Sequence, residues 1–554
     1  MKQPFGRKET NAMGMYLDSR NPYESYKAAA TGTYFVDKSA LLKELIPALG
    51  TEERFFCITR PRRFGKSVMA NMIAAFLGKK EDTAGIFRSL QIAHEQQCYL
   101  HLNQHRVIFI DFSRVSRDCT AYAQYIGRIE DGINRDIMAA YPQCQLAFGG
   151  AVWDNLQAVF ETAAQKFVIV IDEWDAPFHM SFVTAEDRKQ YLLFLKSLLK
   201  GQAYAELVYM TGVLPIAKYS SGSELNGFLE FDMAGSKRFG TYFGFTESET
   251  DMLYQKYRKL QQASGQALGV TRNALKDWYD GYDTASGVRI YNPRSVVYAL
   301  TNNQIRNYWT SSGPYDEIFY YIRHNVAEIR DDLAWMMSGE GVEAKMLEYA
   351  ATAPQLHTKD QIYSAMTVYG LLTYRKENER VYIPNRELME QYREMLVSNE
   401  SLGYMNRLAR ESAGMLKATL AGDTERMAEI LKYVHDTESP VFSYNSEAEL
   451  SAVVNLVYLA ARDRYRVERE DKAGEGFVDF IFYPQYQGED CLILELKVNA
   501  TPKEAIRQIK DRRYALRFAG KLGEERRYAG RVLAVGISYD RASKKHACEV
   551  EVLS

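Results

Sequence analysis

The sequence of 554 residues lacks several features, and each absence argues against a class of protein. Its six cysteines form no C-x-x-C pair and no zinc-binding spacing, which argues against a disulfide framework and favours reduced thiols. No apolar run approaches the roughly 18 residues of a membrane span, and the N-terminus has no apolar signal-peptide core. We therefore expect a cytoplasmic protein without a membrane segment.

An excess of one charge sign is also missing, because the formal net charge is only −2. No overall field then attracts nucleic acid, so any such contact has to come from a local patch. What is present is ordinary for a globular protein, with 46% hydrophobic and 25% charged residues. At typical domain sizes the length predicts about three domains.

The stretch from Phe55 to Leu77 has the layout of a phosphate-binding P-loop. An apolar run typical of a buried strand is followed by a turn, by Gly65-Lys66-Ser67 and by an amphipathic helix. Backbone N–H groups at a helix N-terminus attract anions, which is why the chemistry needs this order. Lys66 is expected to reach the β- and γ-phosphates of ATP, and Ser67 to ligate Mg²⁺.

One position departs from the general motif G-x-x-x-x-G-K-S/T, because Arg60 stands where the first glycine belongs. A chance Gly-Lys-Ser at a helix start is the plain alternative. The flanking strand and helix, together with acid-ended strands downstream, favour the nucleotide site. The residues expected to surround the phosphates are Arg63, Phe64, Gly65, Lys66, Ser67 and Val68.

The apolar run 167–171 predicts a buried parallel strand that ends in two acids, Asp172 and Glu173. Ligand groups collect at the carboxyl ends of parallel strands, beside a P-loop. Asp172 is therefore expected to hold Mg²⁺, and Glu173 to polarise the attacking water. Asp111 ends another apolar run and is a rival for the metal, but no second acid follows it.

A fourth strand, 206–210, ends in Thr211, which we expect to sense the γ-phosphate, with Lys218 as a weaker candidate. The order of these strands predicts an α/β fold with a doubly wound parallel sheet. Residues 1 to about 30 are polar and expected to be extended. Ser39 and Thr246 are expected to be helix N-caps, the latter in a capping box with Glu249.

The motifs GTYFVDKSALLKELI, ITRPRRFGKSVMANMIAAFL, VIVIDEWDAPF, MTGVLPIAK and YFGFTESE together resemble the bacterial AAA-ATPase-like family with an RPRRFGKS-type P-loop. The resemblance covers about residues 14 to 245 and implies ATP binding. Arg60 agrees with this family, in which the first glycine is commonly replaced. Later landmarks resemble the family's helical extension, where Arg294 either faces the nucleotide from a lid or lies in an aromatic-rich turn.

Two strands near the C-terminus carry a different set of charges. Glu495 and Lys497 are two residues apart on the strand 490–497, so their side chains share one face. Asp479 lies on the neighbouring strand, 476–482. Charges among apolar residues are costly unless they serve each other or a metal. An exposed strand with a simple ion pair is the plainer alternative.

The spacing of Asp479, Glu495 and Lys497 resembles the PD-(D/E)XK nuclease superfamily. The resemblance implies that Asp479 and Glu495 bind Mg²⁺ with the carbonyl of Leu496. Lys497 would then activate the attacking water and offset charge on the scissile phosphate. It also implies a role for Gln508 on the next helix.

The sequence leaves the assignment of other residues in the same pattern open. Tyr514 matches the pattern, and either Glu447 or Glu449 supplies an acid from the first helix. A local basic patch suits phosphate contact, although a solvated helix face explains it equally well. It consists of Lys503, Arg507, Lys510, Arg512 and Arg513.

The sequence therefore predicts an AAA-ATPase-like P-loop domain at 1–240, a helical lid or linker region at 241–440 and a PD-(D/E)XK nuclease-like domain at 441–554. ATP and Mg²⁺ are the expected cofactors, nucleic acid, with DNA preferred, is the expected partner, and a homo-oligomer is left open. ATP is expected to gate metal-dependent cleavage, with defence against foreign DNA as the suggested setting. The alternative is an ATP-dependent switch or scaffold that binds nucleic acid or a protein without cleaving it.

Overall fold

The structure, a computed structural model, forms two compact units. One comprises Met1–Gly313 and Glu343–Glu387, the other Pro314–Val342 and Leu388–Ser554. The predicted division at 240 and 440 follows motifs rather than spatial contact and stays a prediction. The described residues are 14–216, 225, 227–309, 326–337, 339–346, 356, 358–398, 400, 404–436, 447–473, 476–486, 488–519, 528 and 530–553.

The first unit is built on a five-stranded sheet in the order β2-β3-β4-β1-β5. All four neighbouring pairs are parallel, so the predicted doubly wound sheet is confirmed. Strand β4 lies between β1 and β3, which separates the P-loop strand from the strand that ends in Asp172. The strands are β1 (Phe55–Thr59), β2 (Arg106–Asp111), β3 (Phe167–Asp172), β4 (Ala205–Gly212) and β5 (Leu229–Phe231).

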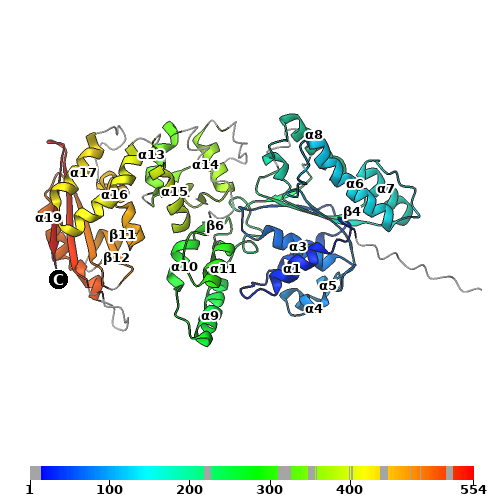
Figure 1. The fold of residues 1–554 in the computed structure, drawn as a ribbon, viewed down its shortest axis with the longest axis horizontal. Helices are drawn as coiled ribbons and strands as arrows, with labels where there is room; N and C mark the ends of the chain where they lie inside the picture. The colour runs from blue at the N-terminus through cyan, green and yellow to red at the C-terminus, as the bar shows by residue number, and fades with distance from the viewer. Residues whose placement is uncertain are drawn as a thin grey trace, which may run out of the picture. The chain divides into compact units, whose positions relative to one another are not determined.

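Helices cover both faces of this sheet, because parallel neighbours need crossover connections. Figure 1 shows α1 and α3 on one face, and α6 and α8 on the other. The expectation of an extended N-terminal segment is wrong for α1, whose buried Tyr26 stacks on Phe87. These helices are α1 (Asn21–Ala30), α2 (Leu42–Leu45), α3 (Lys66–Leu77), α4 (Ala84–Phe87), α5 (Gln96–Tyr99), α6 (Tyr122–Ala140), α7 (Val152–Ala163) and α8 (Ala185–Leu199).

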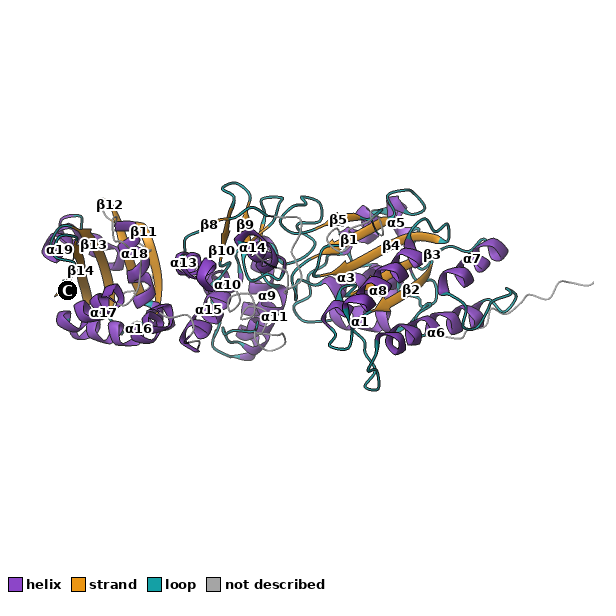
Figure 2. Ribbon diagram, turned by 90° about the horizontal axis from the view of Figure 1, so that it is seen from above, coloured by secondary structure: helices purple, strands orange, loops and turns teal. Residues whose placement is uncertain are grey.

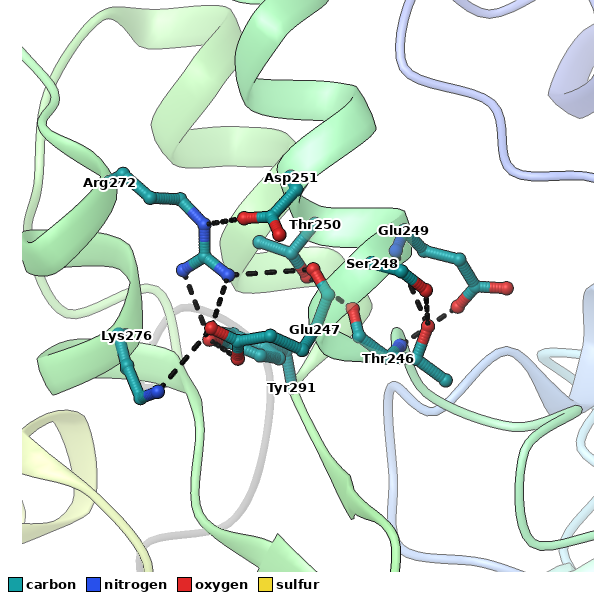
Figure 3. Close-up of polar contacts among 9 residues, drawn as sticks. All are labelled: Thr246, Glu247, Ser248, Glu249, Thr250, Asp251, Arg272, Lys276 and Tyr291. Carbon is teal, nitrogen blue, oxygen red and sulfur yellow. Dashed lines mark hydrogen bonds and ion pairs between the residues drawn. The ribbon is translucent and has the colours of Figure 1, made fainter.

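The helix that follows the sheet begins as predicted, with the Thr246 side chain accepting from the Glu249 N–H in a full capping box. Figure 3 shows this start of α9 beside Arg272, which reaches Glu247 and Tyr291. Glu249 also forms a 2.6 Å ion pair with the buried Lys38, so α9 is tied to the segment before the P-loop.

The Ser39 prediction is wrong. Ser39 begins a short 3-10 turn rather than capping a helix, and its hydroxyl accepts from the Ile92 N–H. Its capping role is lost because Asp37 accepts from the Ser39 N–H and Pro47 breaks the expected long helix into short pieces.

The middle of the chain is predominantly helical, as predicted. Its helices are α9 (Glu247–Ser264), α10 (Arg272–Tyr279), α11 (Pro293–Asn302), α13 (Val326–Met337), α14 (Lys359–Val368), α15 (Arg386–Ser398), α16 (Tyr404–Ala421) and α17 (Thr424–Asp436). The short strands among them are β6 (Tyr282–Asp283), β7 (Arg289–Ile290), β8 (Val342–Glu343), β9 (Thr373–Arg375) and β10 (Arg380–Tyr382).

The second unit contains a mixed five-stranded sheet in the order β11-β12-β13-β14-β15. Only β13 and β14 run parallel, and the crossover between them contains α19, which packs on both strands. The strands of this sheet are among those drawn in orange in Figure 2. The elements are α18 (Glu447–Val457), β11 (Tyr465–Ala473), β12 (Gly476–Pro484), β13 (Cys491–Val498), α19 (Pro502–Asp511), β14 (Val532–Asp540) and β15 (Lys545–Val552).

This αβββαβ order, from α18 to β14, confirms the expected C-terminal α/β domain. Among the described helices, none is both long and apolar enough to cross a bilayer.

Candidate functional site

The phosphate loop joins the buried strand β1 to the N-terminus of α3. Gly65 has φ +87°, a conformation that costs glycine little, and Arg63 has φ +74°. Helix α3 begins at Lys66, so its first-turn N–H groups face the loop without intrahelical partners. The loop therefore presents an anion-binding helix terminus at the carboxyl end of β1, as the sequence predicts.

Lys66 is buried directly beneath this loop, with 4% of its side chain exposed. Its Nζ donates to the Pro61 carbonyl over 3.2 Å. Burial lowers the pKa of Lys66, while Glu173, Asp175 and Asp172 oppose that change. A phosphate at the loop would supply the negative charge that a buried ammonium group needs.

The acids lie where the parallel sheet predicts. Asp111 and Asp172 are register partners at the carboxyl ends of β2 and β3. The Ser67 side chain is hydrogen-bonded to Asp172. Burial raises the pKa of Asp172 to about 7, and this hydrogen bond opposes the rise. Glu173 follows with φ +52°, and burial raises its pKa while Lys66 lowers it.

These groups share one open cavity of about 350 Å³. Three carboxylates and two guanidinium groups line it, so it suits a charged ligand rather than an apolar one. The lining residues are Asn21, Ser25, Arg62, Ser67, Asn71, Phe109, Asp111, Ser113, Arg114, Asp172 and Glu173. Asp111, the rival metal ligand, is thus at the site as well.

Three predicted residues direct their side chains elsewhere. Phe64 is buried against the ring of Tyr282, so only its backbone is available to phosphate. Arg63 donates to the Tyr308 carbonyl over 2.9 Å. Thr211 lies fully buried in β4 and is not among the cavity's lining residues, although its Oγ1 has no hydrogen-bond partner in the described structure. Its role as a γ-phosphate sensor stays a prediction, and Lys218 lies outside the described residues.

Arg60 occupies the position of the missing glycine for a structural reason. Its side chain is 1% exposed and donates to the carbonyls of Thr59, Phe231 and Phe239. It also lies over the ring of Phe243. Arg60 therefore joins the P-loop strand to β5 and to the segment after it, and does not line the cavity.

Sequence reasoning missed several residues that support the site. Asp175 is 2% exposed and accepts from the N–H groups of Val213 and Leu214, which ties the end of β3 to the end of β4. By contrast, Arg294, which the sequence left either facing the nucleotide or in an aromatic-rich turn, lies over the ring of Tyr298 and does not line the cavity. Arg62 and Arg114 line the cavity, but their side-chain directions have no signal in the sequence.

The C-terminal residues also converge. Asp479 on β12 accepts from the Leu496 N–H on β13 over 2.7 Å. Glu495 is 3% exposed, and its Oε1 lies 3.3 Å from Lys497 Nζ. Gln508 on α19 donates to the same Oε1. Burial, and then the charge of Asp479, raises the pKa of Glu495 to about 7.

The remaining C-terminal candidates lie in different surroundings. Glu447 on α18 lies 3.8 Å from Lys497 Nζ, whereas the side chain of Glu449 lies outside the described residues. Tyr514 is buried in the core of the domain. The five residues of the basic patch are exposed on or just after α19, and Lys510 pairs with Glu551.

The donor sets fit Mg²⁺, which prefers carboxylate and hydroxyl oxygens with several waters. Ser67 with Asp172 would hold it at the P-loop, and Asp479 with Glu495 at the C-terminal site. Glu495 Oε2 is buried without a hydrogen-bond partner in the described structure, as expected of an atom that a cation completes. Within the described residues, no group of three or more His, Cys, Asp or Glu side chains forms an all-protein metal cage.

A curated relative and several solved structures are similar to this chain. An uncharacterised protein in the vnfD 5′ region of Azotobacter chroococcum mcd 1 is 26% identical over 286 residues, which are 50% of this chain. The chain spans about half the length, 51%, of that relative. A Walker-type ATPase of Pyrococcus abyssi shares 12% identity with a TM-score of 0.37, covering 64% of this chain and 94% of that one. The ORC2 protein of Aeropyrum pernix shares 12% identity with a TM-score of 0.27, covering 69% and 95%.

Two family models match separate parts of the chain. One, described as a predicted AAA-ATPase, matches residues 24–221, which contain the P-loop, Asp172 and Glu173. The other, described as the PD-(D/E)XK nuclease superfamily, matches residues 447–543, which contain Asp479, Glu495 and Lys497. The chain therefore joins a predicted AAA-ATPase domain to a C-terminal domain of the PD-(D/E)XK nuclease superfamily.

Proposed function

We propose that the protein hydrolyses ATP at the P-loop cavity and cleaves nucleic acid at the C-terminal site. The observation that carries the first half is the cavity itself. It brings Ser67, Asp172 and Glu173 together beside the buried Lys66, at the carboxyl ends of parallel strands.

Each residue has a defined part in ATP hydrolysis. The N–H groups of the loop and Lys66 bind the phosphates, and Ser67 with Asp172 would hold Mg²⁺. Mg²⁺, when bound, neutralises charge that develops on the phosphates. Glu173 is half-buried and has a raised pKa, so it is suited to take a proton from, and orient, the attacking water.

At the C-terminal site Lys497, whose Nζ lies 3.3 Å from Glu495 Oε1, would orient a water molecule and offset charge on a scissile phosphate. Asp479 and Glu495 would hold Mg²⁺, and Gln508 positions Glu495. The exposed basic residues of α19 supply phosphate contacts for a nucleic acid, with DNA preferred. Because both sites share one chain, we further propose that ATP gates cleavage and that the setting is defence against foreign DNA.

The ATPase half is tested by Mg²⁺-dependent phosphate release from the purified full chain. Wild type is expected to turn over ATP, and Lys66→Ala to lose both binding and turnover. Arg88→Ala is the matched control, because Arg88 is exposed on the first unit and does not line the cavity. Equal turnover by wild type and Lys66→Ala would place ATP hydrolysis elsewhere.

The nuclease half is tested with labelled single- and double-stranded DNA and RNA in Mg²⁺ or Mn²⁺. Glu495→Ala is expected to abolish cutting, while the exposed Arg541→Ala on the same domain leaves it intact. If wild type binds nucleic acid but never cuts it, the C-terminal domain is a binding module, and the switch or scaffold function takes the place of cleavage.

A further inference from the structure

Two adjacent arginines in the phosphate loop point to different places. Arg63 donates to the Tyr308 carbonyl and lies over the ring of Trp309. Arg62 lines the cavity together with Ser67 and Glu173. Arg63 has φ +74°, so the backbone turns at this residue, and the two consecutive side chains reach different surroundings.

Arg63 is held firmly, whereas Arg62 is not. The Tyr308 N–H donates to the buried carboxylate of Glu387 over 2.7 Å, which fixes the segment that Arg63 contacts. Among the described residues, no hydrogen bond or ion pair holds the Arg62 side chain. It is only half-buried, so its guanidinium can adjust to a ligand in the cavity.

The charges around Arg62 show what such a ligand would be. Of the two cavity arginines, Arg114 is already paired with Asp111 over 2.9 Å. Arg62 lines the cavity beside Ser67 and Glu173 and, among the described residues, pairs with none of its acids. A guanidinium that lines the cavity at the phosphate loop, together with the residue proposed to orient water, lies where the terminal phosphate is expected.

We propose that Arg62 is a catalytic residue that contacts the γ-phosphate of ATP and is supplied by the same chain. This inference rests on the proposed ATP site. A planar guanidinium forms two parallel hydrogen bonds to phosphate oxygens, and the bonds strengthen as charge develops during transfer. Hydrolysis by this chain then needs no arginine from a neighbouring copy.

The first test compares ATP and ADP affinities of wild type, Arg62→Ala, Arg62→Lys and Arg88→Ala, by titration of fluorescent nucleotides. A lost γ-phosphate contact weakens ATP binding about tenfold or more and leaves ADP binding within about twofold. Arg62→Lys keeps the charge and recovers part of the loss. Equal ATP affinity in Arg62→Ala and wild type, or an equal loss of ADP affinity, overturns the proposal.

The same titration keeps the proposal separate from the ATP site on which it rests. Lys66→Ala loses both nucleotides if the site is correct, whatever Arg62 does. If Lys66→Ala binds both nucleotides as tightly as wild type does, the ATP site is not at the P-loop, and the proposal fails with it.

The second test asks which chain supplies the arginine. Turnover by Arg62→Ala is expected to fall at least about 10²-fold. Mixing it with Lys66→Ala, which keeps Arg62 but lacks the lysine, leaves turnover at that low level if each chain serves its own site. Recovery of activity in the mixture means that the arginine acts on a neighbour's nucleotide, which contradicts the proposal.

Discussion

The P-loop cavity and the C-terminal site pair their charges differently. At the P-loop, Lys66 contacts a backbone carbonyl and Asp172 a serine hydroxyl, and among the described residues no ion pair joins the two. At the C-terminal site, Lys497 and Gln508 both contact Glu495. At the first site Lys66 has no ion pair among the described residues, although Arg114 and Asp111 of the cavity pair with each other, whereas at the second site Lys497 pairs directly with Glu495. A phosphate at the first site would meet a lysine without an ion pair in the described chain. A cation at the second site would share Glu495 with Lys497 and Gln508, which contact Oε1, and would find Oε2 without a partner in the described structure.

The largest expected effect is the loss of ATP hydrolysis in a variant that still binds ATP. Glu173→Gln keeps the size of the side chain and removes the group that takes a proton from water. ATP turnover is expected to fall about 10²- to 10³-fold while ATP stays bound. Phosphate release and nucleotide binding measure the two effects separately, and metal binding at the C-terminal site should not change. Normal turnover in this variant would remove Glu173 from the mechanism.

A second prediction concerns Arg60, which joins strands rather than binding phosphate. Arg60→Ala removes the donor to three carbonyls and opens a cavity, so the free energy of unfolding of the first unit should fall by about 3 kcal/mol. Calorimetry should show the first unit's transition lowered and the second unit's unchanged. Arg62→Ala is the comparison variant. The Arg62 side chain is half-buried and, among the described residues, forms no hydrogen bond or ion pair, so its removal should lower the free energy of unfolding only slightly. A larger loss of stability in Arg62→Ala than in Arg60→Ala would contradict the account.

A third prediction uses the raised pKa of Glu495. Because its pKa is about 7, the carboxyl is increasingly protonated below neutral pH, and cation binding must release that proton. Mn²⁺ affinity at this site is therefore expected to fall about tenfold for each pH unit below 7 and to level off above it. Titration calorimetry of wild type and Glu495→Gln measures this, since the variant should bind weakly at every pH. A flat profile in wild type would contradict the raised pKa of Glu495 or its part in binding the cation.

In the absence of metal, the free energy of unfolding changes with pH in the opposite direction to the Mn²⁺ affinity. The folded pKa of Glu495 lies above the value of an unfolded glutamate, so between about pH 4.5 and 7 the folded state binds more protons. Stability contributed by this group is therefore present at low pH and lost as the pH rises through 7. Glu495→Gln should remove this dependence.

The smallest effect is expected at the start of α9. Thr246→Ala removes the hydroxyl that accepts from the Glu249 N–H, which should lower the free energy of unfolding by about 1 kcal/mol. ATP turnover should stay at the wild-type level, because Thr246 does not line the cavity. Thr246→Ser keeps the hydroxyl and serves as the control, and a loss in both variants would mean that the cap is not the cause.

Much of the fold could be predicted because it depends on local pattern. Short apolar runs that end in acids predicted β2 and β3, and strand, turn and helix predicted the P-loop. Helix α1 was missed because its polar sequence buries few residues, and its stability comes from packing on α3.

Residues that act through distant partners could not be predicted. Arg60 donates to the carbonyls of Phe231 and Phe239, 171 and 179 positions away, so nothing near it in the sequence indicates its role. Arg62 and Arg63 are chemically identical neighbours, and only the turn between them assigns one to the cavity. Likewise the sequence left Glu447 and Glu449 as alternatives, and only the packing of α18 beside β13 brings Glu447 to Lys497.

The most direct test of the central claim measures metal-dependent cleavage of DNA by the full chain with ATP, with ADP and without nucleotide. Wild type is expected to cut DNA at rates that depend on the nucleotide. With ATP, Glu173→Gln is expected to keep the cleavage rate of the ATP-bound state, because it binds ATP without hydrolysing it. Glu495→Ala is expected not to cut at all. Identical cleavage in all three nucleotide conditions, or cleavage that persists in Glu495→Ala, would contradict the account.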